Sequence, residues 1–299
     1  MSNVYIVGRL SVDIKIDVNR FPVKNEVVMG TNAGFSAASK AEVEAITLAK
    51  LSNGAKILGA VGSDVYGREI VNTLKKYPSI DIKHVREIEG EASGICFVLN
   101  NNKSYEKVRT LGANTKITEE NVHDFLESAK EKDILLTDLE LGPTLTKYTL
   151  KEARDKKMTI IFNPSPVDKN AIDLINFADY LILDEDDFNN LRSQVELEYF
   201  TKELKSLNTI VTLGANGVYC PDEDVRFSAF FPDEAIDTRR ADAIFIGAFI
   251  SMIKDGHKMI ESIDFARGAA SLSCTRRGTY ESIPERAEVL KLIKREDLL

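Results

Sequence analysis

The sequence predicts a doubly wound α/β fold, in which a mostly parallel sheet carries helices on both faces and a small antiparallel β lid projects from it. The first observation is a series of short apolar runs: VYIVG, AKILGAVG, DILLTDLEL, MTIIFNPSP, DYLILDEDD and NTIVTLGANGVYC. Continuous apolar runs of this length are typical of parallel strands that are buried on both faces. The second observation is that amphipathic stretches separate these runs, as the crossover helices of such a sheet would.

The amphipathic stretches predict helices over residues 42–51, 68–75, 119–132 and 145–156. Each lies between two apolar runs, so strands and helices alternate along the chain. No linker rich in Pro, Gly or Ser interrupts this alternation, and no internal repeat is visible. We therefore expect one domain over residues 1–299.

Two regions depart from the alternation and form the third observation. SVDIKIDVNRFPVKNEVVMGTNAGF and GICFVLNNNKSYEKVRTLG alternate apolar with polar residues and contain turn-like breaks. This pattern predicts antiparallel hairpins over approximately residues 11–36 and 93–111. Such a lid would cover a ligand or pair with another subunit.

Composition narrows the class of protein. The 299 residues carry a net charge of -8, which argues against a nucleic-acid or membrane-surface partner, because both need clustered Lys and Arg. The three cysteines Cys96, Cys220 and Cys274 lie far apart in apolar runs and are expected to be reduced and buried. Neither they nor the three histidines have the spacing of metal ligands, so no metal site is expected. No signal peptide is recognised at the N-terminus, and we expect a cytoplasmic protein.

Polar residues follow several of the predicted strands, where ligands bind in open α/β sheets. They are Asp13, Glu140, Asn163, Asp184 to Asp187 and the turn from Thr212 to Gly217. Taken singly, each is better explained as a helix cap or a turn than as a functional residue. The first strand lacks a following G-x-G-x-x-G, and no G-x-x-x-x-G-K-[ST] is present, so a dinucleotide oxidoreductase and a P-loop enzyme are disfavoured.

Taken in order, the motifs resemble those of the ribokinase-like, or PfkB, carbohydrate kinases over essentially the whole chain. They are RFPVKNEVV, GAVGSDVYG, LGANTKIT, FNPSPV, TLGANG, the DT at Asp237, FIGAFI and SIP. No single motif is decisive, but this many in one order is specific.

The resemblance implies transfer of the γ-phosphoryl group of ATP, with Mg²⁺, to a sugar, a nucleoside or a similar alcohol. It implies substrate contacts from Asp13, Lys40 and Glu140. It implies nucleotide contacts from Asp184, Asp187, Thr212, Gly214, Gly217 and the helix start after Asp237. Such a reaction needs a carboxylate to take the hydroxyl proton and N–H donors at a helix N-terminus for the phosphate. The resemblance also implies a homodimer formed through the lids.

The sequence departs from the family where the phosphate is held. The family reads D-T-x-G-A-G-D, whereas this chain reads Asp237-Thr-Arg-Arg-Ala-Asp-Ala243 without a gap. The anion-hole positions are thus Arg240, Ala241 and Asp242, and the catalytic Asp position is Ala243. Asp242 is the alternative candidate for the base. It stands one residue before the catalytic Asp position, and on a helix one residue turns the direction of a side chain by about 100°. We expect Asp242 to be an N-cap instead.

The substrate motif departs as well. The family's G-G-K-G-A-N-Q-A corresponds to Ala38-Ser-Lys-Ala-Glu-Val-Glu-Ala45, in which only Lys40 and Ala45 persist. The added side chains are expected to obstruct a sugar, with Glu42 adding a bulky charge and Val43 removing the hydrogen bonds of Asn. On the nucleotide side, Asp184 beside Asp187 would repel a triphosphate unless a metal intervened.

Three hypotheses follow. The first is a homologue with little or no catalysis, retained for ligand binding, scaffolding or regulation, with no cofactor expected. The second is an active kinase for an unusual carbohydrate or nucleoside, which uses ATP and Mg²⁺, Asp242 as base and an arginine as phosphate clamp. The third is a purely structural partner subunit, which the persistence of Asp13, Lys40 and Glu140 disfavours.

Overall fold

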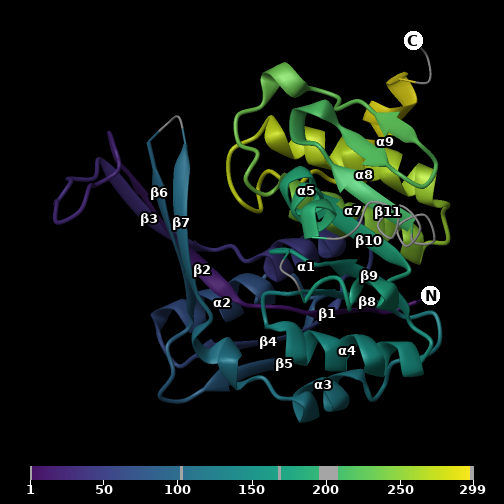
Figure 1. Cartoon of the computed structure of the whole chain (residues 1–299), viewed down its shortest axis with the longest axis horizontal. Helices are drawn as coiled ribbons and strands as arrows, with labels where there is room; N and C mark the ends of the chain where they lie inside the picture. The colour runs from purple at the N-terminus through teal and green to yellow at the C-terminus, as the bar shows by residue number, and fades with distance from the viewer. Residues whose placement is uncertain (1, 102–103, 168–169, 195–207, 297–299) are drawn as a thin grey trace.

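The computed structural model describes residues 2–101, 104–167, 170–194 and 208–296 (Figure 1). Its main sheet has nine strands in the order β13-β12-β11-β10-β9-β8-β1-β4-β5. The strands are β1 (Val4–Val7), β4 (Lys56–Gly62), β5 (Asp81–Ile88), β8 (Ile134–Asp138), β9 (Thr159–Asn163), β10 (Tyr180–Asp184), β11 (Asn208–Thr212), β12 (Val218–Cys220) and β13 (Val225–Phe227). The strands from β11 to β5 pair in parallel, and only the β12 and β13 edge is antiparallel. The mostly parallel sheet predicted from the apolar runs is confirmed.

Helices cover both faces of this sheet. They are α1 (Lys40–Leu51), α2 (Val65–Lys75), α3 (Glu119–Leu126), α4 (Pro143–Asp155), α5 (Glu185–Gln194), α7 (Ala241–Lys254), α8 (Met259–Cys274) and α9 (Arg286–Glu296). Strand β1 shows why two cores form: Val4 and Ile6 join the core of α1, α7 and α8, while Tyr5 and Val7 join the core of α3, α4 and α5. A strand buried on both faces must be apolar throughout, because its side chains alternate between the two cores. Among the described residues, none of these helices has the length and apolar character needed to cross a membrane.

Capping explains where the predicted helix boundaries move. Helix α1 begins two residues before the predicted start, because the Ser39 side chain accepts from the Glu42 N–H and the Glu42 carboxylate accepts from the Ser39 N–H. Helix α3 ends at Leu126, six residues before the predicted end at residue 132. The chain there turns into strand β8, with the Asp133 N–H donating to the Lys130 carbonyl.

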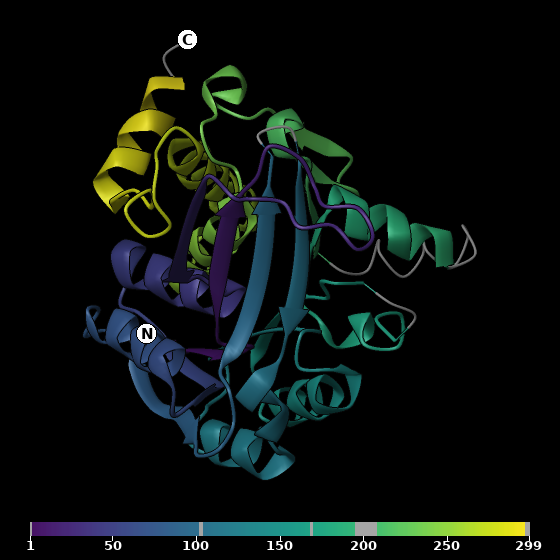
Figure 2. The same ribbon diagram turned by 90° about the vertical axis from the view of Figure 1, so that its left-hand side faces the viewer.

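A second sheet of four strands forms the lid, in the order β3-β2-β6-β7. Its strands are β2 (Ser11–Asp17), β3 (Asn32–Ala37), β6 (Gly94–Asn100) and β7 (Tyr105–Thr110). The two predicted hairpins are antiparallel, but they join through a parallel pairing of β2 with β6. Figure 1 shows these strands projecting from the body, and Figure 2 shows them face on.

The register of the lid separates its two faces. Asp13 pairs with Cys96, which pairs with Arg109, and this row lines a cavity against the body. The next row runs from Ile14 through Phe97 to Val108 and therefore points the other way. The side chains of Phe97 and Val108 are exposed. The lid thus presents a polar face to the cavity and an apolar face outward.

The cysteines fit the expectation only in part. Cys96 and Cys220 are free and buried, whereas Cys274 is free and half-buried beside the cavity. Burial raises the pKa of the Cys220 thiol to about 12. That thiol is therefore held in its unreactive protonated form.

Candidate active site

A cavity of about 580 Å³ lies between the lid and the carboxyl ends of the central strands. Strands β2, β6 and β7 line one side of it, and the start of α1, the ends of β9 to β11 and the start of α7 line the other. This is where an open α/β sheet places a ligand, since the strand order reverses near β1. The cavity brings together most of the residues predicted for substrate and nucleotide.

The three predicted substrate residues all line this cavity. Asp13 lies on β2, Lys40 is the first residue of α1, and Glu140 follows β8. Each of the three is already bonded to another side chain of the protein, and the partners differ.

The carboxylate of Asp13 forms an ion pair with the Arg240 guanidinium. Asp13 belongs to the lid, whereas Arg240 stands immediately before α7 in the body. The pair is largely buried, with side-chain exposures of 21% for Arg240 and 14% for Asp13. The position that the resemblance gives to a phosphate-binding glycine is thus occupied by a cation bound to a predicted sugar contact.

The carboxylate of Glu140 lies between two guanidinium groups. Arg9 Nε donates to Glu140 Oε2 over 2.9 Å, and Arg109 Nη1 donates to Glu140 Oε1 over 3.0 Å. Burial alone would raise the pKa of Glu140, but the nearby cations Arg9, Lys40 and Arg109 outweigh it and hold this pKa below its usual range. Glu140 is therefore an ionised acceptor whose oxygens both have partners.

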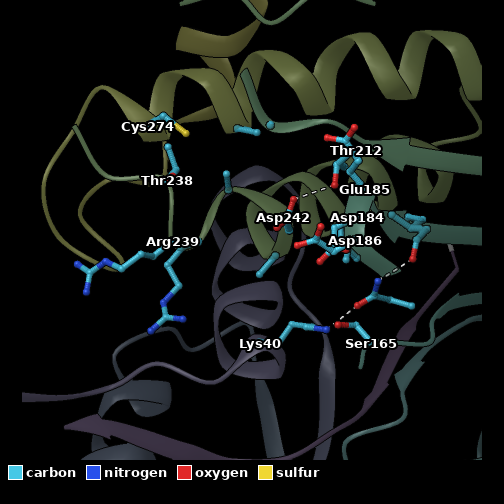
Figure 3. A pocket seen from close by; sticks show the side chains of 18 of the residues that line it. Lys40, Ser165, Asp184, Glu185, Asp186, Thr212, Thr238, Arg239, Asp242 and Cys274 are labelled. Carbon is cyan, nitrogen blue, oxygen red and sulfur yellow. Dashed lines mark hydrogen bonds between the residues drawn. The ribbon is translucent and has the colours of Figure 1, made fainter. Parts of the chain in front are cut away.

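Lys40 is held by an amide. Its Nζ donates to Asn163 Oδ1 over 2.6 Å, and Asn163 Nδ2 in turn donates to the Ile182 carbonyl over 2.6 Å (Figure 3). This chain of bonds connects the start of α1 to the ends of β9 and β10. It fixes the ammonium group at the cavity wall without neutralising its charge.

Acidic side chains gather at the other end of the cavity (Figure 3). Asp184 ends β10, Glu185 and Asp186 begin α5, and all three line the cavity. Asp242 is close by, because its Oδ1 accepts from Thr212 Oγ1 over 2.9 Å. Burial and the neighbouring carboxylates raise the pKa of Asp184 above its usual value. Thr212 and Gly214, two of the residues predicted for a nucleotide, also line the cavity.

Three predicted nucleotide residues do not line the cavity. Asp187 is buried and accepts from the Val167 N–H at 3.0 Å, while its own N–H donates to Asp184 Oδ1. Gly217 adopts a φ of 89° and lies so close to the Phe227 carbonyl that no side chain would fit. Asp237 bonds to Arg239 over 2.6 Å. All three therefore support the loops around the site.

The start of α7 corrects one expectation. Asp242 is not the N-cap, because the helix begins at Ala241 and Arg240 occupies the cap position without a side-chain cap bond. Asp242 is instead the second helical residue and is bonded to Thr212. Ala241 and Ala243 line the cavity, and Ala243 is 6% exposed. The position expected for the catalytic Asp thus faces the cavity with a methyl group.

The start of α1 corrects a second expectation. Glu42 does not obstruct the cavity, because its carboxylate turns into the fold and accepts from the N–H groups of Ser11 and Ser39. Its burial raises its pKa to about 7. Val43 is also fully buried away from the cavity, so of the replaced positions only Ala38 and Ser39 line it beside Lys40.

Sequence reasoning missed three cations of the site, Arg9, Lys107 and Arg109. The last two alternate with Val108 on β7, which is a signal that the strand directs them to one face. Which face is the inner one depends on the pairing of β7 with β6. Arg9 follows β1 directly and gave no motif signal.

Comparison with known proteins identifies the family to which the chain belongs. The model of the pfkB family carbohydrate kinases matches residues 1–286. The chain belongs to this family. The ordered motifs had predicted this membership, and it is confirmed.

Relatives within the pfkB family match over nearly their whole length. Ribokinase of Schizosaccharomyces pombe is 26% identical, with 97% of each chain covered, and ribokinase of Lactococcus lactis is 26% identical, with 98% of each covered. Among solved structures, ribokinase of Thermotoga maritima superposes with a TM-score of 0.86 at 25% identity, covering 98% of this chain and 100% of that one. Ribokinase of Arabidopsis thaliana, solved complexed with ribose and ATP, superposes with a TM-score of 0.84 at 23% identity, covering 98% and 99%. The chain is therefore a ribokinase-family sugar-kinase homologue with the ribokinase fold.

Proposed function

We propose that this pfkB-family protein binds a small ligand in its cavity and has lost efficient phosphoryl transfer. The observation that carries the proposal is the ion pair between Arg240 and Asp13, which lies in the cavity that Ala243 also lines. Arg240 stands where the family resemblance implies a phosphate-binding glycine, and Asp13 where it implies a sugar contact. The Arg240 side chain therefore both fills the anion site and binds the Asp13 carboxylate, which would otherwise be available to a sugar.

The expected loss is large. Without a general base, phosphorylation slows by about 10²- to 10⁴-fold. Removing the backbone N–H cradle takes away a further contribution to the transition state, although the two losses are not additive. Glu140 is also unavailable to a neutral sugar unless Arg9 and Arg109 give up their bonds to it.

The residues at the other end do not fit Mg-ATP as a binding partner. Asp184, Glu185, Asp186 and Asp242 line that end, and within the described part of the chain no ion pair neutralises any of them. A triphosphate without its metal is repelled by such carboxylates. Among the described residues, no group of three Asp, Glu, His or Cys side chains is placed to hold a metal ion that would bridge them. We therefore assign no step of a reaction to ATP or Mg²⁺ in this protein.

One observation favours the alternative of an active kinase. The Asp242 carboxylate lines the cavity, and only one of its oxygens accepts from Thr212. The other oxygen is a candidate base for an atypical substrate. The variant Asp242→Asn separates the two functions, because it retains the shape and removes the base.

The test is a phosphoryl-transfer assay with labelled ATP and a panel of pentoses, hexoses and nucleosides, run on the wild type, Asp242→Asn and Asp13→Asn. We expect all three to remain at the rate of the buffer blank. Saturable turnover by the wild type that Asp242→Asn abolishes would refute the proposal and establish the alternative.

We further propose that the protein is a homodimer formed through the lids. The outward row of the lid, with Phe35, Phe97 and Val108 at exposures of 50%, 44% and 67%, supports this assembly. A sheet face of this kind is stabilised when a second copy covers it.

A further inference from the structure

The two ends of the cavity have opposite charge. Six cationic side chains line the cavity. Lys107 and Arg109 belong to the lid, and Arg240 and Arg9 are linked to it through Asp13 and Glu140. Lys40 and Arg239 line the cavity from the body. Within the part of the chain that the structure describes, three carboxylates form ion pairs with these cations, those of Asp13, Glu140 and Asp237. The cations that line the cavity therefore outnumber the carboxylates paired with them by three, and the far end has the four carboxylates described above.

Two buried acids behind the lid end reduce this excess only in part. Burial raises the pKa of Asp138 to about 7 and that of Glu44 to about 8. At neutral pH the Glu44 carboxyl group is thus mostly protonated and the Asp138 carboxyl group about half protonated. Asp17, the remaining acid near Arg239, is bonded to Lys15 at 3.0 Å.

Two of the cations have donor groups without a counterion. Arg9 is 4% exposed, and its Nη1 has no hydrogen-bond partner among the described residues. Lys107 Nζ lies 4.3 Å from the centre of the Tyr105 ring, and no carboxylate within the described residues forms an ion pair with it. Burial together with Arg240 and Arg109 lowers the pKa of Lys107. Cations that repel one another inside a cavity require an anion to stabilise them.

The start of α1 adds to the same field. Ser39 and Lys40 line the cavity at the N-terminus of this twelve-residue helix, so its positive end faces the lid. Together with the Lys107 ammonium group, which has no carboxylate partner among the described residues, it forms a surface that complements an oxyanion and offers a neutral sugar few free acceptors.

We propose that the lid end of the cavity is a binding site for an anionic sugar derivative, a sugar phosphate or a sugar acid, in preference to a neutral sugar. The assignment rests on the proposed function, because it gives the class of the ligand that is bound without being phosphorylated. The oxyanion lies among Lys107, Arg109 and Arg240, and the uncharged part of the ligand extends toward the middle of the cavity. The carboxylates at the far end exclude the reverse orientation.

The test is isothermal titration calorimetry on the full chain at one ionic strength, with ribose, ribose 5-phosphate, gluconate and inorganic phosphate as probes. We expect at least one of the two anionic sugars to bind about tenfold or more tightly than ribose, and more tightly than inorganic phosphate. The tighter of the two identifies the anionic group. The assignment would be overturned if ribose bound as tightly as both anionic sugars or more tightly, or if inorganic phosphate bound as tightly as they do. It would also be overturned if none of the probes bound.

A variant locates the site. Lys107→Met is expected to weaken the binding of the anionic sugar by about tenfold and to leave the affinity for ribose unchanged. Lys83→Met is the matched control, because Lys83 is exposed on β5 and does not line the cavity. Equal affinities in the two variants, at unchanged melting temperature, would contradict the assignment. ATP turnover measured in the same samples reports on the proposed function separately, since turnover would refute that function whether or not the anion binds.

Discussion

Arg240 and Asp13, which are 227 residues apart in the chain, form an ion pair that joins the body of the protein to its lid. The pair bridges the end of the cavity at which the resemblance implies that a sugar meets a phosphate. It also links the start of α7 to strand β2. A ligand that binds at this point must therefore either leave the ion pair intact or break it.

Removing Arg240 should therefore change which ligand the cavity accepts. We expect Arg240→Ala to release the Asp13 carboxylate and to raise the affinity for ribose by about tenfold, because a charged acceptor becomes available to its hydroxyls. Titration calorimetry measures this. Arg239→Ala is the control, since Arg239 bonds to Asp237 and leaves the pair intact. Unchanged ribose binding in Arg240→Ala would mean that the pair does not block Asp13.

Mg-ATP should not stabilise the protein. A ligand present at 100 times its dissociation constant adds roughly 2.7 kcal/mol to the free energy of unfolding. We expect no shift of the melting temperature with millimolar Mg-ATP, because Asp184 and its acidic neighbours face the nucleotide end. A clear and saturable shift would show that a metal overcomes this repulsion.

The buried Glu44 should make stability depend on pH. Its Oε1 has no hydrogen-bond partner among the described residues, and burial raises its pKa from 4.5 to about 8. The folded state thus holds a proton that the unfolded state releases above pH 4.5, so its stabilising effect is complete below that pH and is lost as pH rises to about 8. Within this pH window the free energy of unfolding falls by up to about 1.4 kcal/mol per pH unit because of Glu44.

Chemical denaturation between pH 5 and 8 checks this dependence. Glu44→Gln is expected to lose less stability than the wild type as pH rises, because the amide does not titrate. Glu120→Gln, an exposed residue of α3, should retain the wild-type slope. The same slope in Glu44→Gln as in the wild type would place the titration elsewhere.

The lid dimer has its own test. Phe97→Asp places a charge at the centre of the outward row and should convert the dimer to a monomer in light scattering, with the fold unchanged by circular dichroism. Phe97 pairs with both Ile14 and Val108, so the charge stands between two lid strands. A monomeric wild type at high protein concentration would contradict the dimer.

The fold could be predicted because strands buried on both faces leave a continuous apolar run, as in β1 and β10. The grouping of Asp13, Lys40 and Glu140 was also predictable, since strand ends and the following helix meet at one edge of the sheet. The bonds within the site were not. Sequence spacing does not show that Glu42 turns inward to close a capping box, or that Arg9 reaches Glu140 across 131 residues.

Asp242 illustrates the same limit. Its type and position favour an N-cap, but the helix already begins at Ala241, and a hydroxyl from β11 reaches the Asp242 carboxylate. Tertiary contacts of this kind decide a side chain's role, and one sequence does not contain their geometry.

The loss of phosphoryl transfer is tested most directly by the rate of transfer from ATP to ribose in a series of revertants. Ala243→Asp restores the base but leaves Arg240 bonded to Asp13. We therefore expect it to remain at the blank rate. Arg240→Gly, Asp242→Gly and Ala243→Asp combined should gain nucleotide binding or slow ATP hydrolysis before ribose phosphorylation, because Ala38 and Ser39 still line the sugar end. Efficient ribose phosphorylation by Ala243→Asp alone would contradict this, since one methyl group would then be the whole defect.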